Sequence, residues 1–140
     1  MAGVKLSENH KRAISTTLTV LDELIVCIEK WVDGHQYRSV LYQEKNDLNS
    51  SHRKALKKQT QILQDYLDIL RKDMAIKKTT QSAVNDIWSR VSAFRENIME
   101  LEAKHMKRYG EISSESQIYL NNLSKKLLAE IDRILQIIKE

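Results

Sequence analysis

The complete absence of proline over 140 residues constrains the fold of this sequence more than any other feature. Proline breaks the interior of a helix, because it lacks an N–H group and its ring clashes with the preceding turn. A chain without proline is free to form long, uninterrupted helices. Only three glycines are present, and the β-branched and aromatic residues are too scattered to form strand patterns. The sequence therefore predicts an all-α protein.

Apolar residues recur at steps of three and four, the spacing that places them on one side of a helix. This pattern predicts four helices, at about residues 8–33, 37–77, 81–109 and 114–139. Asp33-Gly34 supplies a stop for the first helix, and a Ser-x-x-Gln capping box opens the fourth at Ser114. Because short links join the helices, we expect an up-down-up-down antiparallel four-helix bundle that forms a single domain over 1–140.

The second helix is expected to be the longest. Its predicted seam contains apolar residues that fall seven apart, joined by four others: Leu41, Leu48, Ala55, Ile62, Ile69 and Ile76, with Leu56, Leu63, Tyr66 and Leu70. Asn, Asp and Ser within residues 46–51 favour turns over helix interiors. The heptad nevertheless passes through this segment without a change of phase. We therefore expect one continuous helix, with any bend falling at 46–51.

Several features bear on the location of the protein. The N-terminus lacks the apolar segment of a secretory signal, and the run at 24–28 is far shorter than the ~20 residues that span a bilayer. The single cysteine, Cys27, cannot form an internal disulfide. These features predict a cytoplasmic protein without a transmembrane segment. The net charge of +4 permits contact with nucleic acid but does not require it.

Glu102 and His105 form a Glu-x-x-His pair that could offer two ligands to a metal. If the second and third helices form a hairpin, His105 lies level with His52, and two imidazoles with one carboxylate suit zinc or iron. The motif occurs only once, however, and Glu102 lies on the flank of the predicted seam. A metal site is therefore the third hypothesis, and we expect no cofactor. No Gly-rich phosphate loop or nucleophile constellation is present, so we expect no enzyme.

A basic cluster on the second predicted helix is the alternative functional site. Arg53, Lys54, Lys57 and Lys58 share an arc opposite the apolar one, and no acidic residue interrupts positions 48–64. Such a cluster is typical of proteins that contact phosphate backbones. No aromatic residue interleaves with the lysines for base stacking, and a solvated surface has the same composition. Nucleic-acid binding is therefore the second hypothesis.

The preferred hypothesis rests on surplus apolar surface. Trp31, Tyr37 and Tyr42 cluster where the first two helices meet, and aromatic residues are enriched at interface anchors. The helices also carry more apolar positions than one narrow seam needs. We therefore expect an adaptor, regulator or scaffold that acts through protein–protein contact, with another protein or a second copy of itself as the partner.

Overall fold

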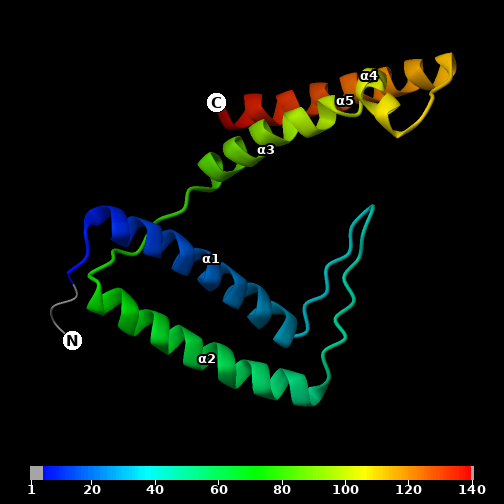
Figure 1. Ribbon diagram of the computed structural model, residues 1–140. Helices are drawn as coiled ribbons and strands as arrows, with labels where there is room; N and C mark the ends of the chain where they lie inside the picture. Colours follow the sequence, from blue (N-terminus) through cyan, green and yellow to red (C-terminus); the bar gives the residue numbers. More distant parts are fainter. Residues whose placement is uncertain (1–4, 140) are drawn as a thin grey trace. The chain divides into compact units, whose positions relative to one another are not determined.

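The computed structural model describes residues 5–139, which are all-helical and contain no strand. The described helices are α1 (Glu8–Val32), α2 (Ser50–Asp73), α3 (Ala83–Met99), α4 (Ala103–Met106) and α5 (Ser114–Lys139), with a 3-10 turn at Lys107–Tyr109 (Figure 1). The all-α prediction is confirmed. The chain divides into two compact units at the Lys78–Thr79 boundary, and each is described by itself.

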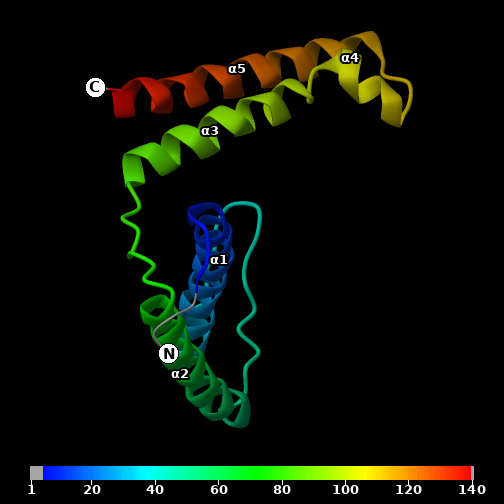
Figure 2. The same ribbon diagram turned by 60° about the vertical axis from the view of Figure 1, so that its left-hand side comes forward.

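In the first unit, α1 and α2 run antiparallel and pack along their length (Figure 2). Ser7 caps α1 by accepting a hydrogen bond from the His10 N–H at 3.1 Å. The three-four spacing of apolar residues predicted for this helix is confirmed, since the residues with that spacing are all buried or half-buried: Ile14, Leu18, Leu21, Ile25, Ile28 and Val32. Gly34 ends the helix in the left-handed region at φ 92°, a conformation that glycine adopts without strain.

The prediction of a second helix over 37–77 is wrong at both ends, because α2 begins at Ser50 and ends at Asp73. Asn49 caps it, and the Asn49 side-chain oxygen accepts from the His52 N–H at 2.8 Å. The predicted seam is only partly correct. Leu41 lies outside the helix, while Ala55, Ile62, Tyr66 and Ile69 are exposed on it. Leu56, Leu63 and Leu70, which the prediction also includes, are half-buried, and the less exposed side of α2 further contains Thr60, Leu67 and the adjoining Met74.

In the second unit, α3 and α5 form another antiparallel pair, and α5 spans the predicted fourth helix. The predicted third helix over 81–109 is instead interrupted after Met99. Side chains of α5 stabilise the interruption by bonding the backbone groups that it frees. Asn121 Oδ1 accepts from the Ala103 N–H at 3.0 Å, and the buried Ser124 hydroxyl donates to the Ile98 carbonyl at 3.2 Å.

Ala75 provides a test of how α2 ends. The N–H groups of Ala75 and Ile76 donate to the carbonyls of Lys72 and Arg71, and Ala75 has φ 53°. This left-handed conformation costs an L-residue about 1–2 kcal/mol, a cost that glycine avoids. Glycine loses about 0.5–1 kcal/mol of this advantage, because it gives up more conformational entropy on folding. We therefore predict that Ala75→Gly stabilises the protein by up to about 1 kcal/mol in urea unfolding followed by circular dichroism. Ala55→Gly, in the exposed interior of α2, is the matched control and should destabilise by about 1 kcal/mol. Destabilisation by both would contradict the assignment.

Candidate functional site

Residues 36–46, most of which the sequence places at the start of the second helix, form a short antiparallel arm with one isolated bridge instead (Figure 1, the cyan segment after α1). The Glu44 N–H donates to the Tyr37 carbonyl at 2.7 Å, and the Ser39 N–H donates to the Tyr42 carbonyl at 2.9 Å. These two bonds flank an antiparallel bridge between Arg38 and Gln43. The segment is therefore a hairpin, which we call the arm.

Beyond the last backbone hydrogen bonds of the arm, on the side away from the turn, side chains bond to backbone N–H groups. A carboxylate oxygen of Glu44 accepts from the Tyr37 N–H at 2.9 Å. The side-chain oxygen of Gln36 accepts from the Asn46 N–H at 2.7 Å. Such side-chain bonds to backbone groups compete directly with helix formation. They explain locally why residues 36–46 leave the helical pattern.

Asn46 and Arg53 tie the arm to the C-terminus of α1. The Asn46 amide nitrogen donates to the carbonyls of Trp31 at 2.7 Å and His35 at 2.9 Å. Nη1 of Arg53 donates to the carbonyls of Val32 at 2.8 Å and Trp31 at 3.1 Å. Arg53 also donates to the Asn46 side-chain oxygen at 3.3 Å. These bonds satisfy carbonyls that a helix end leaves unpaired, and they place a cation at the negative end of the helix dipole. We call this network the Asn46–Arg53 anchor.

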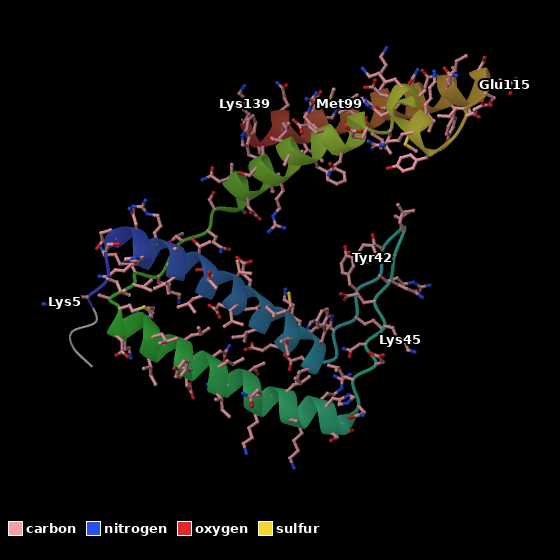
Figure 3. All side chains as sticks on the ribbon, viewed as in Figure 1. Lys5, Tyr42, Lys45, Met99, Glu115 and Lys139 are labelled. Atoms are coloured by element: carbon pink, nitrogen blue, oxygen red, sulfur yellow. The ribbon has the colours of Figure 1, made fainter. Side chains whose placement is uncertain are left out.

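The arm displays a concentrated apolar surface. The rings of Tyr37 and Tyr42 stack with centroids 5.7 Å apart. Val40 and Leu41, at the turn, are 93% and 95% exposed. Figure 3 shows Tyr42 and Lys45 on the arm. The turn of the arm therefore exposes two aliphatic side chains beside a pair of stacked aromatic rings.

The structure therefore brings together two of the three predicted contact residues. Tyr37 and Tyr42 lie on the arm, while Trp31 lies on α1 and is 38% exposed. Sequence reasoning missed Val40 and Leu41, because Leu41 was assigned to a helical seam. The signal that could have found them is the set of turn-forming side chains at Asn46, Asp47 and Asn49, which mark the end of a non-helical segment.

Each helix pair also exposes an apolar face beside its seam. In the first unit the residues that directly precede seam positions are exposed, among them Val20, Leu24, Trp31, Ile62, Tyr66 and Ile69. One residue corresponds to about 100° on a helix. Antiparallel helices turn in opposite senses when viewed from one end, so these positions on α1 and α2 fall on the same side of the pair. We call this surface the first apolar face.

The second unit repeats the arrangement. Large apolar residues are exposed on both helices: Ile87 and Phe94 on α3, and Leu127, Ile134 and Ile137 on α5. All of them except Ile87 directly precede a half-buried residue. We call this surface the second apolar face. Arg90 and Glu130 also directly precede half-buried residues, so the stripe contains charged positions as well. Beside this face, Arg95 of α3 pairs with Asp132 of α5 through two hydrogen bonds of 2.6 and 3.2 Å, which raise the pKa of the Arg95 guanidinium.

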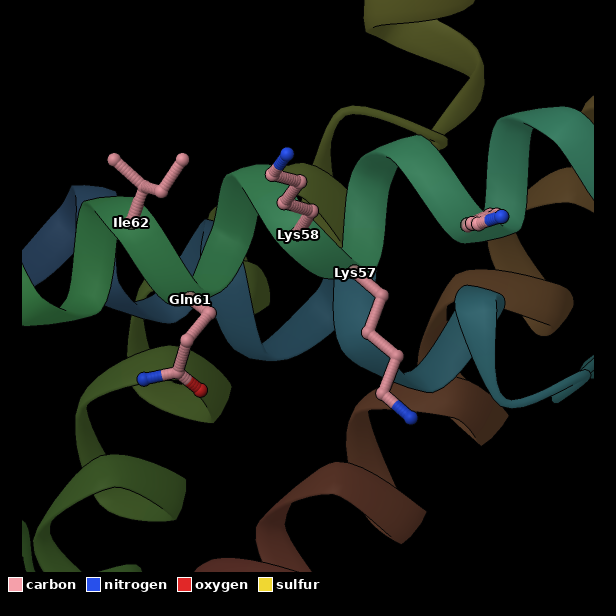
Figure 4. Close-up of a pocket in the computed structure, with 5 residues that line it drawn as sticks. Lys57, Lys58, Gln61 and Ile62 are labelled. Atoms are coloured by element: carbon pink, nitrogen blue, oxygen red, sulfur yellow. The ribbon is translucent and has the colours of Figure 1, made fainter.

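The basic cluster is only partly available to a ligand. Lys54, Lys57 and Lys58 line an open depression on α2 together with Gln61 and Ile62 (Figure 4). Arg53 instead bonds carbonyls in the anchor. The second unit, residues 79–140, contains nine basic and nine acidic residues, so the net charge of +4 lies entirely in the first unit. On the same helix, hydrogen bonds from Lys72 and then Arg71 lower the pKa of the exposed Asp68.

The proposed metal ligands have other local roles. His52 accepts from the Asn49 N–H through Nδ1 at 3.4 Å as part of the α2 cap. The sequence predicted that Glu102 and His105 lie on one continuous helix. Instead, Glu102 is the residue before α4, and His105 lies within α4. His105 Nδ1 lies 3.8 Å from a carboxylate oxygen of Glu100. Among residues 5–139, no group of three or more His, Cys, Asp or Glu side chains could hold a metal ion.

Comparison with known proteins assigns no family: no family model, no curated protein and no solved structure matches the chain. Within residues 5–139, none of the helices has both the length and the apolar character needed to cross a bilayer.

The Asn46–Arg53 anchor generates a prediction about the order of the arm. Arg53→Ala removes the donors to the Val32 and Trp31 carbonyls and to the Asn46 side-chain oxygen, so only the Asn46 amide group still holds the arm against α1. We predict at least tenfold faster hydrogen exchange at the Ser39 and Glu44 amides, measured by NMR. Lys54→Ala, which removes a neighbouring cation outside the anchor, should leave both rates unchanged. Equal effects of the two substitutions would show that the anchor does not order the arm.

Proposed function

We propose that this protein acts without catalysis, through protein–protein contact, with the arm as its main contact site. One observation carries the proposal: an ordered hairpin presents Val40 and Leu41 at 93% and 95% exposure. The stacked Tyr37 and Tyr42 rings extend the same surface. Burying an aliphatic side chain that water otherwise surrounds contributes about 1.5–3 kcal/mol, so these two residues could supply much of the binding energy of a small interface.

The anchor supports this proposal because it reduces the entropic cost of binding. A two-stranded hairpin alone in water is at best marginally stable. Here the side chains of Gln36, Glu44, Asn46 and Arg53 hold the arm in one conformation before any partner arrives. A pre-organised loop loses less conformational freedom when it binds. This arrangement is typical of a recognition element.

The contact is tested by replacing Leu41 with a photo-crosslinking amino acid in the cell of origin. We expect one or a few discrete cross-linked products, because the side chain of residue 41 would lie against a defined partner surface. The same amino acid at Arg12, on an exposed part of α1, is the matched control and should give no such product. Absence of a product from position 41, with the protein folded and present at normal abundance, would contradict the proposal.

We also propose that the helices close into the antiparallel four-helix bundle predicted from the sequence, with the two apolar faces as the surfaces that it buries. The similar composition of the two faces supports this arrangement. In each helix pair, most of the exposed apolar residues directly precede a residue that is buried or half-buried between the two helices. Residues 74–82 link α2 to α3 and are slightly longer than the usual helix–helix connection of about 2–8 residues. Closure would leave the arm as the main exposed apolar element.

Thiol reactivity tests this closure. In a Cys27→Ser background, Leu24→Cys places a single thiol on the first apolar face, and Gln61→Cys places one on the lysine-bearing side of α2, about 100° from that face. We predict that a thiol reagent modifies the residue 24 thiol at least a hundredfold more slowly in the folded protein than in urea. The residue 61 thiol should react at nearly the same rate in both. Equal rates at the two positions would exclude bundle closure through the first apolar face.

A second candidate function, nucleic-acid binding through α2, is favoured by one observation: Lys54, Lys57 and Lys58 share one exposed depression in the unit that carries the whole net charge. Contacts between lysines and phosphates weaken steeply with salt, because binding releases condensed counterions. If this function is correct, binding of a labelled oligonucleotide falls at least tenfold between 50 and 200 mM salt, a loss of the order expected for a few phosphate contacts. Lack of binding at low salt would remove it.

A further inference from the structure

The outer edges of the arm carry unpaired backbone groups. The bridge between Arg38 and Gln43 is closed by the hydrogen bonds of the residues that flank it. In an antiparallel pair this pattern makes Arg38 and Gln43 a non-hydrogen-bonded pair, whose own N–H and C=O groups point away from each other. Within residues 5–139, these N–H and C=O groups form no hydrogen bond with another backbone group. Each edge of the arm is therefore a template for another strand.

Charge distinguishes the two edges. Antiparallel addition of an identical strand about Arg38 would place Arg38 directly opposite its own copy, and like charges in that position are destabilising. Addition about Gln43 would set the uncharged Gln43 opposite itself. It would also place Glu44 opposite Tyr42 of the second copy. The edge that contains Gln43 can therefore pair with its own copy without like-charge repulsion, and the edge that contains Arg38 cannot.

We propose that the arm pairs with the arm of a second copy of this chain, through antiparallel addition along residues 42–44 with a two-fold axis at Gln43. This inference rests on the proposed function, because it names the partner of the arm. A hairpin of two strands is marginally stable by itself, whereas the two arms together form four paired strands.

The symmetry of this contact limits the assembly to two copies. A two-fold contact uses the same edge on both partners and closes on itself. The remaining edge on each side carries Arg38, which opposes further strand addition. The product is a dimer and not a filament.

The experiment is sedimentation equilibrium of the full chain over a concentration series, with two pairs of matched variants. Gln43→Pro removes an outward N–H without removing a bond inside the arm, and Arg38→Pro does the same on the other edge. We expect a dimer for the native chain, at least a tenfold larger dissociation constant for Gln43→Pro, and little change for Arg38→Pro. Circular dichroism confirms that each variant retains its helices.

Charge exchange provides a second test that leaves the backbone intact. Gln43→Lys and Gln43→Glu should each weaken the dimer at least tenfold, because like charges then meet at the two-fold axis. An equimolar mixture of the two variants should restore association. A native chain that remains monomeric at millimolar concentration, or a mixture that fails to associate, would overturn the inference. Discrete cross-linking of residue 41 to a different protein in the cell would then leave the proposed function standing.

Discussion

The hydrogen bonds that Asn46 and Arg53 donate to the end of α1 determine the form of the first unit. A helix leaves its last carbonyls without internal partners, and they must be satisfied by solvent or by other groups. Here residues from beyond the loop satisfy the carbonyls of Trp31, Val32 and His35. The same bonds fix both ends of residues 36–46 and lead the chain directly into the Asn49 cap of α2. The arm is ordered because its two ends are held, although its own ladder contains few bonds.

Two adjacent apolar stripes on most helices explain the rest of the architecture. One stripe forms the seam within each pair, where Ile25 is fully buried and Ser124 nearly so. The other lies about 100° away and stays exposed in each described unit. Together with the arm, these stripes leave each described unit with several large apolar side chains exposed.

The sequence was sufficient where local signals agree with the packing. The start and end of α1 follow from Ser7 and Gly34, and its seam follows from an unambiguous three-four spacing. The seam of α2 could not be predicted in the same way, because Ala55, Ile62 and Ile69 have the same seven-residue spacing as Leu56, Leu63 and Leu70. Only contact with α1 selects between them. The interruption after Met99 depends on Asn121 and Ser124, which lie about 20 residues further along the chain. The arm depends similarly on a hydrogen bond from the Asn46 side chain to the Trp31 carbonyl. These residues are 15 positions apart, so no pattern of neighbouring residues predicts the bond.

The most direct measurement is the proton NMR spectrum of the arm in the native chain. In an antiparallel non-hydrogen-bonded pair the two Cα atoms are only about 4.5 Å apart, so their α protons lie in close contact. An ordered arm predicts a strong nuclear Overhauser effect between the α protons of Arg38 and Gln43, together with contacts between the rings of Tyr37 and Tyr42. Sequential amide contacts of a continuous helix through residues 37–49, with no contact between the α protons of Arg38 and Gln43, would contradict the arm and the functions proposed for it.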